Sequence, residues 1–512
     1  MSQPIFCQRL KTTKVSNEVF DVFLDNVARI GDPQILLALL GGSLIGMLFG
    51  LIPGLGGIQA LTICLPFTFG WDPQVAMFLF AGIMGSVTKG GSIPAILINT
   101  PGMAPNACTC LDGFPLARRG EAGRAIGLAA SSCVLGSLLG VVVLLLLLPV
   151  VRLLIFAFGP PEFFWLIMFG IVAIAFVARG NFLKGLVAGG LGILISLIGY
   201  SEVFGVRRFT LSSDYLWDGI NLVPFFIGIF AIGELLSYTT RGGVISSKGI
   251  HVRGLSSVFD GFREIFRYPA TFFRGSFIGV VVGLIPGIGG SVANFLSYTA
   301  AVQMSKKPET FGKGNPEGIV ASESSNDAKD GGALLPTLGF GIPGSPEMAV
   351  LLGAFMLHGL QPGPFLLKEH PEIAVSLIAG LVIANLISSG LMIVGADQLA
   401  KVTLIPVRYI APVVVVIGLA GAYAVRGNLW DVLLAIIAGL FGYTLRRHGF
   451  PVIPLVMGFI LGVLAETAFY QSFKMGLGSY SVFFSSPISL SLFALVLLLL
   501  LYPFLQQLRR RK

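Results

Sequence analysis

The stretch GLIPGLGG at residues 50–57 recurs almost unchanged as GLIPGIGG at residues 283–290, 233 positions later. A second pair of motifs follows these copies in the same order. GGSIP at 90–94 leads to NTPG at 99–102, and GGALLP at 331–336 leads to GIPGS at 341–345, with an offset of 241 or 242. A constant order of motifs at a nearly constant offset indicates an internal duplication.

The composition around these motifs excludes a water-soluble protein. Hydrophobic residues make up 54% of the 512 positions and charged residues only 12%, whereas an average soluble domain has about 25% charged residues. A helix needs about 20 apolar residues to cross a bilayer. Apolar stretches of full or half that length lie at 34–52, 125–151, 163–178, 183–200, 220–238, 269–285, 373–395, 409–425, 430–445, 450–466 and 488–506. We therefore expect an all-α polytopic membrane protein with about 12 transmembrane segments.

The charge distribution predicts the orientation of the chain. The longest polar interval, 239–268, is rich in Lys and Arg, and the chain ends RRRK at 509–512. Basic segments stay in the cytoplasm, so both should lie inside. Residues 269–512 must then cross the membrane an even number of times. Inverted repeats with an odd number of crossings each therefore require 488–506 as an additional helix, and parallel repeats are the alternative.

These observations predict five parts of the chain. Residues 18–31 have apolar positions at helical spacing, which favours a helix that lies on the membrane surface or, equally, packs on its own protein. The predicted parts are 1–33, a leader with this amphipathic helix; 34–238, the first membrane repeat; 239–268, a cytoplasmic basic linker; 269–485, the second membrane repeat; and 486–512, an extra transmembrane helix with a basic tail.

Two segments are apolar but interrupted by Gly and Pro. Residues 74–111 carry only Lys89 as a charge, and 331–367 carry only Glu347. Irregular backbone at membrane depth survives only where it is buried in protein or lines a cavity. We expect re-entrant hairpins or discontinuous helices, typical of a secondary transporter with its site between repeated halves. Half-helix N-termini would favour a carboxylate, and half-helix C-termini a cation such as Na⁺.

Ionisable residues in or beside these segments are candidates for function. Lys89 could neutralise a substrate carboxylate or extend to the membrane interface. Glu347 could be a proton or sodium ligand, or a residue on a loop. Glu323, Asn326 and Asp327 lie in a polar stretch that is either a solvated loop or a cation site. We expect no enzyme, because a hydrolase would need a Ser-Lys or paired-Asp arrangement that the chain lacks.

The motifs closely resemble those of the large membrane subunit (TctA type) of bacterial tripartite tricarboxylate transporters. The resemblance extends over residues 33–505 and includes the motifs above, LDG at 111–113 with PLAR at 115–118, and HGLQPGP at 358–364. It implies a multi-pass inner-membrane protein that imports a citrate-like tricarboxylate or other organic acid. Its partners would be a periplasmic binding protein and a small membrane subunit. Coupling to Na⁺ or H⁺, no cofactor and an elevator-like movement of inverted repeats are also implied. A stand-alone organic-anion channel or exporter is the alternative.

The resemblance, for the loops and turns, and the ionisable residues above, for Lys89, Asn326 and Asp327, together give the expected site. The substrate is expected at the two interrupted loops, with Lys89 as a charged contact: Lys89, Asn99, Thr100, Pro101, Gly102, Gly341, Pro343, Gly344 and Ser345. The coupling ion is expected beside them, at Gly54, Gly56, Gly287, Gly289, Asn326 and Asp327, with Na⁺ as the candidate metal. Lys89 stands where the family often has an aromatic residue, and Asp327 stands where a second Asn is usual. Both differences change the charge near the site and leave a substrate other than citrate open.

Overall fold

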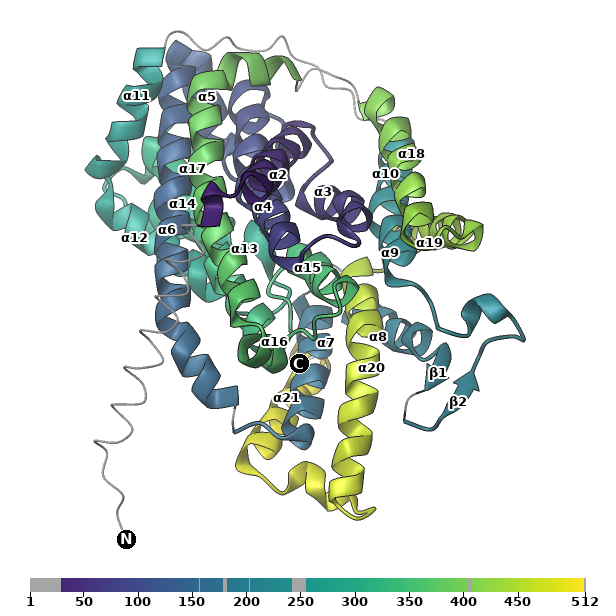
Figure 1. Cartoon of the computed structure of the whole chain (residues 1–512). Coiled ribbons are helices and arrows are strands. Elements are labelled where there is room, and N and C mark those ends of the chain that lie inside the picture. The colour runs from purple at the N-terminus through teal and green to yellow at the C-terminus, as the bar shows by residue number, and fades with distance from the viewer. Residues whose placement is uncertain are drawn as a thin grey trace.

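The computed structural model describes residues 29–155, 157–177, 182–201, 203–241, 255–402 and 407–510, which form a large helical bundle (Figure 1). The helices before the central linker are α2 (Pro33–Leu51), α3 (Gly57–Cys64), α4 (Pro73–Ile98), α5 (Cys110–Leu116), α6 (Ala122–Ile155), α7 (Pro160–Val177), α8 (Phe182–Ser196), α9 (Leu222–Phe226) and α10 (Gly233–Arg241). Strands β1 (Gly199–Ser201) and β2 (Val206–Arg208) form an antiparallel hairpin.

The second half is also helical. Its helices are α11 (Leu255–Glu264), α12 (Pro269–Gly283), α13 (Gly289–Met304), α14 (Pro316–Phe340), α15 (Pro346–Leu357), α16 (Pro364–Glu369), α17 (Pro371–Val402), α18 (Val407–Arg426), α19 (Leu429–Arg447), α20 (Val452–Met475) and α21 (Pro487–Arg510). Short 3-10 or π segments lie between them, among them η3 (Ala104–Ala107) and η6 (Ile227–Ile232).

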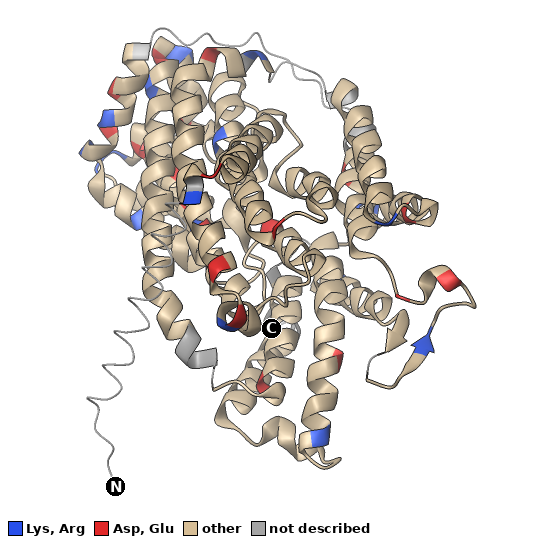
Figure 2. Ribbon diagram, viewed as in Figure 1, with Lys and Arg blue, Asp and Glu red and all other residues tan. Residues whose placement is uncertain are grey.

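Several helices have the length and composition of membrane spans. Seven in the described part of the chain can cross a bilayer: Pro33–Leu51, Pro73–Ile98, Cys110–Val151, Pro371–Leu399, Tyr409–Arg426, Leu429–Arg447 and Val452–Met475. Shorter apolar helices accompany them, including Pro160–Phe176, Phe182–Ser196, Pro269–Gly283 and Pro487–Tyr502. Figure 2 shows long uncharged stretches of helix, with many charged residues gathered at the end of the bundle near α11. The predicted all-α polytopic class is confirmed.

The two interrupted segments are longer helices than expected. α4 continues through Gly90, Gly91 and Pro94, and ends at Asn99, which has a left-handed φ of 55°. α14 ends in the same way at Gly341, with φ 70°. A left-handed residue is a common way to end a helix. The first break in each segment therefore follows this long helix, at 99–103 or 341–345, and the second segment is broken again at 358–363, between α15 and α16.

The polar stretch 317–330 is part of α14. Asn315 caps the helix by accepting a hydrogen bond from the N–H of Glu317, and Pro316 is its first residue, a favoured combination at a helix start. From residue 318 to 339 every residue of the helix is buried. The solvated-loop interpretation of this stretch was therefore wrong, because neighbouring helices supply partners for its polar side chains.

Glycines bring α2 against α4 and α12 against α14 in the same way. Three glycines of α2, four residues apart, face carbonyl groups of α4, and three glycines of α12 face α14. A Cβ on any of them would lie 3.0 Å or less from a carbonyl oxygen: Gly42 from Leu79, Gly46 from Ile83, Gly50 from Val87, Gly275 from Ala321, Gly279 from Ser325, and Gly283 from Lys329. Each second-half glycine lies 233 positions after its first-half counterpart, and the residue that it contacts lies 242 positions after the corresponding first-half residue.

The halves are also interleaved. α4 packs against α17 of the second half, and α14 packs against α6 of the first. A second group of helices, α7, α8, α20 and α21, packs together at the lower end of the view in Figure 1. Within the predicted linker, residues 255–264 form α11, which lies on α6 and pairs Glu264 with Arg124 of that helix. The predicted leader, most of the amphipathic helix and linker residues 242–254 lie outside the described residues.

Candidate functional site

A cavity of about 500 Å³ lies where the two copies of the duplicated turn meet. The first copy contributes residues 54–59 and the second contributes 287–292. Residues 102–105, just after the break that ends α4, form a third part of the wall. The other lining residues are Glu234, Lys329, Pro346, Glu347, Arg446 and 450–453. Segments from both halves therefore share one cavity.

Four helices begin at the wall of this cavity, among them α20 at Val452, and three of them bring small or polar residues to it. These three are α3 at Gly57, α13 at Gly289 and α15 at Pro346. The first N–H groups of a helix have no acceptor within the helix, and the helix dipole adds partial positive charge there. No side-chain cap occupies the start of α3 or α13. The backbone of this cavity is therefore suited to an anion such as a carboxylate.

Four charged side chains line the cavity. Lys329 pairs with Asp330 at 2.5 Å and passes over the start of α13, because a Cβ on Gly290 would lie 2.5 Å from its Cε. Glu347 lies over the start of α3, and Arg446 pairs with Glu234 at 2.9 Å. The charged lining residues are thus two basic and two acidic. Because the helix N-termini add partial positive charge, the cavity favours an anion over a cation.

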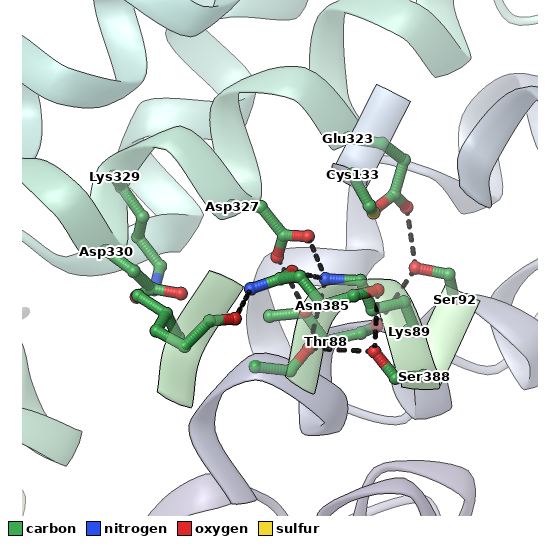
Figure 3. Close-up of polar contacts among 12 residues, drawn as sticks. Thr88, Lys89, Ser92, Cys133, Glu323, Asp327, Lys329, Asp330, Asn385 and Ser388 are labelled. Carbon is green, nitrogen blue, oxygen red and sulfur yellow. Dashed lines mark hydrogen bonds and ion pairs between the residues drawn. The ribbon is translucent and has the colours of Figure 1, made fainter. Parts of the chain in front are cut away.

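Outside the cavity lining, a buried ion pair joins α4, α14 and α17 (Figure 3). The Nζ of Lys89 contacts Asp327 Oδ2 and Asn385 Oδ1, and donates to the Gly85 carbonyl at 3.0 Å. Thr88 donates to the other oxygen of Asp327 at 2.6 Å. The side chains of Lys89 and Asp327 are 0% and 2% exposed. The pair connects the two halves through residues that are 238 positions apart in the sequence.

A second buried carboxyl, Glu323, lies one helical turn before Asp327. Its Oε1 accepts hydrogen bonds from Ser92, at 2.8 Å, and from Thr109, and its Oε2 accepts from the thiol of Cys133 at 3.2 Å. These partners come from α4, the residue before α5, and α6. Glu323 is fully buried, so its charge is stabilised by protein groups and not by solvent.

The structure brings only part of the predicted set to the cavity. The lining residues among them are Gly54, Gly56, Gly102, Gly287 and Gly289. Gly344 packs its backbone on Gly283, as Gly102 packs on Gly50, and Ser345 caps α15 by accepting from Met348 N at 3.4 Å.

The remaining predicted residues lie elsewhere. Asn99 is exposed, Thr100 and Pro101 are partly exposed, and Gly341 and Pro343 are buried in the second loop. Lys89 and Asp327 are each other's partners, so Lys89 neither lines the cavity nor extends to an interface. Asn326 is fully buried, and neither its amide nitrogen nor its oxygen has a hydrogen-bond partner.

Sequence reasoning missed Lys329, Arg446 and Glu234 as cavity residues. Lys329 stands where the first half has Val87, 242 positions earlier, and each contacts a duplicated glycine through its carbonyl group. An alignment of the two halves would therefore have marked Lys329 as a charge at a position of close packing. Nothing in the sequence places Arg446 and Glu234, because they reach the cavity from α19 and α10.

Helices of membrane length, packed around a cavity that several helix N-termini face, indicate a multi-pass membrane protein. The chain belongs to the tripartite tricarboxylate transporter TctA family, whose model matches residues 36–457. The protein is therefore a membrane component of a tricarboxylate transport system, as the sequence motifs predicted.

Two relatives come from Agrobacterium vitis. An uncharacterized 52.8 kDa protein in the TAR-I ttuC' 3' region is 33% identical over 471 residues, which cover 92% of this chain and 93% of that protein. An uncharacterized protein in the TAR-II ttuC' 3' region is 35% identical over 234 residues, 46% of this chain and 97% of that protein. No solved structure matches the chain.

Proposed function

We propose that this protein is the large membrane subunit through which a bacterium imports a carboxylate across its inner membrane. The substrate is a citrate-like tricarboxylate or another organic acid, delivered by a periplasmic binding protein. A small membrane subunit completes the system, and entry is coupled to Na⁺ or H⁺. The observation that carries the proposal is the convergence of the N-termini of α3, α13 and α15, together with Lys329, on one cavity between the halves.

The carboxylate seat is the region between the starts of α3 and α13. Both helix starts have no side-chain cap, and Lys329 lies across the second one. An anion here would accept hydrogen bonds from backbone N–H groups and face the ammonium group. Glu347, from the start of α15, is placed for a hydroxyl group of the substrate or for a coupling cation.

The repeated helix contacts support a structural repeat, and the proposal takes the two repeats to be inverted and to move in an elevator-like way. The pairs α2–α4 and α12–α14 share the same glycine contacts, and α4 and α14 are held together by the Lys89–Asp327 pair. These helices would move as one body. The group α7, α8, α20 and α21 would remain fixed, so that the cavity faces one side of the membrane and then the other.

The proposal is tested by reconstitution of the protein with its two partner subunits in proteoliposomes. Uptake of radiolabelled citrate, succinate and malate is measured with an imposed Na⁺ or H⁺ gradient. We expect uptake of at least one acid, and dependence on the binding protein and on a gradient. Flux without the binding protein would support the channel or exporter alternative, and uptake without either gradient would refute the coupling.

The carboxylate seat is tested with the double variant Lys329→Gln/Asp330→Asn. Removing both charges leaves neither member of this pair as an unpaired ion, so the fold is retained while the cation at the seat is lost. We expect the KM for the transported acid to rise about tenfold or more, because a charge-assisted hydrogen bond contributes roughly 1.5–3 kcal/mol. The control is Lys306→Met, an exposed lysine in the α13–α14 connection. An unchanged KM in the double variant would show that Lys329 does not bind the transported acid.

A further inference from the structure

We propose that Glu323 carries the coupling proton, so that H⁺ and not Na⁺ drives the transport stated above. The inference rests on the proposed function for the role of the proton in transport. The protonation of Glu323 itself can be tested without it. The geometry that points to Glu323 is a buried carboxyl with only neutral partners, held between the halves and linked to the cavity wall.

The charges around Glu323 do not balance. Lys89 is already paired with Asp327, and within the described residues no Lys, Arg or His forms an ion pair with Glu323. The other titratable groups near it are Asp327 on its own helix, Cys133 on α6, and Cys108 and Cys110 at the start of α5. None of these supplies a positive charge. A buried carboxylate without a cation is costly, and it becomes neutral when a proton is supplied.

The hydrogen bonds of Glu323 suit both of its protonation states. When Glu323 is charged, the hydroxyl of Ser92 donates to its Oε1 across 2.8 Å. When Glu323 is protonated, its O–H can donate to Ser92 across the same distance, while the Ser92 hydroxyl turns to the Thr88 carbonyl 3.0 Å away. Thr109 and Cys133 donate in both states. A proton is therefore gained or lost by rotation of one hydroxyl, without movement of heavier atoms.

The same partners disfavour a sodium ion. Hard cations take oxygen ligands, whereas a thiol occupies one side of this carboxyl. Two hydroxyl groups occupy Oε1. A sodium ion on the carboxylate would have to displace these donors and would meet a sulfur atom. A proton needs no such space.

A chain of hydrogen bonds leads from Glu323 through Ser92 to Asn106, which lies behind the cavity wall with its Oδ1 against Gly91. Asn106 donates to Ser92 Oγ at 2.9 Å and to the Thr88 carbonyl at 3.2 Å. Its Oδ1 is buried and has no hydrogen-bond partner in the described structure, and its neighbour Pro105 lines the cavity. Glu323 is thus two side chains from the cavity wall. In the proposed step, a hydronium ion from the outer side transfers its proton to Glu323 and leaves water. The carboxyl later returns the proton to water on the inner side.

The first test uses Glu323→Gln in the complete three-subunit system in proteoliposomes. Gln has the shape of the protonated acid but cannot release a proton. We expect uptake driven by a pH gradient to fall at least tenfold, whereas exchange of labelled for unlabelled substrate stays within about twofold of the unmodified protein. Glu317→Gln, a partly exposed carboxyl at the start of the same helix, is the matched control and should retain both activities.

The second test measures the proton itself in the purified protein. Infrared difference spectra between acid and alkaline buffers should contain a carboxylic acid C=O band that is absent in Glu323→Gln and present in Glu317→Gln. Absence of a Glu323 band from the unmodified protein would overturn the proposal, as would uptake driven by Na⁺ with no acidification of the vesicle lumen. A normal band together with no carboxylate exchange would instead contradict the proposed function.

Discussion

At the scale of single residues, the interior is organised by polar partners from distant parts of the chain. The sequence left two roles open for Lys89, a substrate contact or a residue at the membrane interface. In the structure it is fully buried against Asp327 and Asn385. Desolvation of two charges is repaid only with good geometry and further hydrogen bonds. Thr88, the Gly85 carbonyl and Asn385 supply those bonds. The pair thus holds α4, α14 and α17 together.

Removal of one member of this pair should destabilise the protein strongly. We expect Lys89→Met to lower the free energy of unfolding by about 3–5 kcal/mol, because Asp327 would be left as an unpaired buried charge. The double variant Lys89→Met/Asp327→Leu should recover most of this loss. The stability of both variants is measured by thermal unfolding in detergent, with size-exclusion chromatography as the readout.

The control for this experiment is again Lys306→Met, whose exposed side chain should leave the unfolding temperature unchanged. If Lys89→Met unfolded at the same temperature as the control, the ion pair would not support the fold. If the double variant were as unstable as the single one, loss of packing instead of the unpaired charge would be the cause.

At the scale of elements, the spacing of glycines decides which helices can lie close together. Gly42, Gly46 and Gly50 allow the backbones of α2 and α4 to approach each other, and the second half repeats the arrangement. Small residues four apart are a common device of membrane helix packing. The sequence showed the glycine excess and the duplicated motifs, but not which glycines touch a neighbour.

Two adjacent glycines of α2 allow a matched comparison. A Cβ on Gly42 would lie 2.2 Å from the Leu79 carbonyl oxygen, whereas a Cβ on Gly41 would meet nothing within 4 Å. We expect Gly42→Ala to destabilise the protein by about 1–3 kcal/mol through overpacking. Gly41→Ala should be neutral or stabilise it by up to about 1 kcal/mol through helix propensity. Equal unfolding temperatures for the two variants would contradict the α2–α4 contact.

The polar stretch of α14 shows where reasoning from pattern fails. Glu317 to Asp330 is as polar as a loop, and hydropathy alone therefore indicated exposure. The structure buries it because Ser92, Thr109 and Lys89 lie opposite its carboxyl groups. A buried polar group can be recognised only when its partner is known. These partners are more than 200 residues away in the chain.

At the scale of the whole molecule, the interleaving of the halves places the cavity between them. Neither half holds a complete cavity wall, because 54–59 and 287–292 face each other across it. The predicted orientation also belongs to this scale. Figure 1 shows α11 at one end of the molecule and the connection between α20 and α21 at the other.

The orientation can be tested by labelling introduced cysteines. With the basic linker inside, Ser256→Cys near α11 should react with a membrane-impermeant maleimide only after permeabilisation of the cells. Leu477→Cys follows α20, is 96% exposed and should react in intact cells. Labelling of the parent protein is subtracted. The opposite pattern would invert the topology, and labelling of both sites from outside would contradict the odd number of crossings between them.

Sequence alone determined the helical membrane class, the duplication, the two broken segments and the family, because hydropathy, composition and motif order are local properties. It also predicted that the two duplicated turns, at 50–57 and 283–290, belong to the functional site. Only the tertiary structure decided that Lys89 pairs with Asp327, that Lys329 reaches the cavity, and that Glu323 has neutral partners. These facts depend on how helices far apart in the chain, 190 residues in the case of Cys133 and Glu323, turn their faces towards each other. The energy of a buried charge is set by those facing groups and not by its neighbours along the chain.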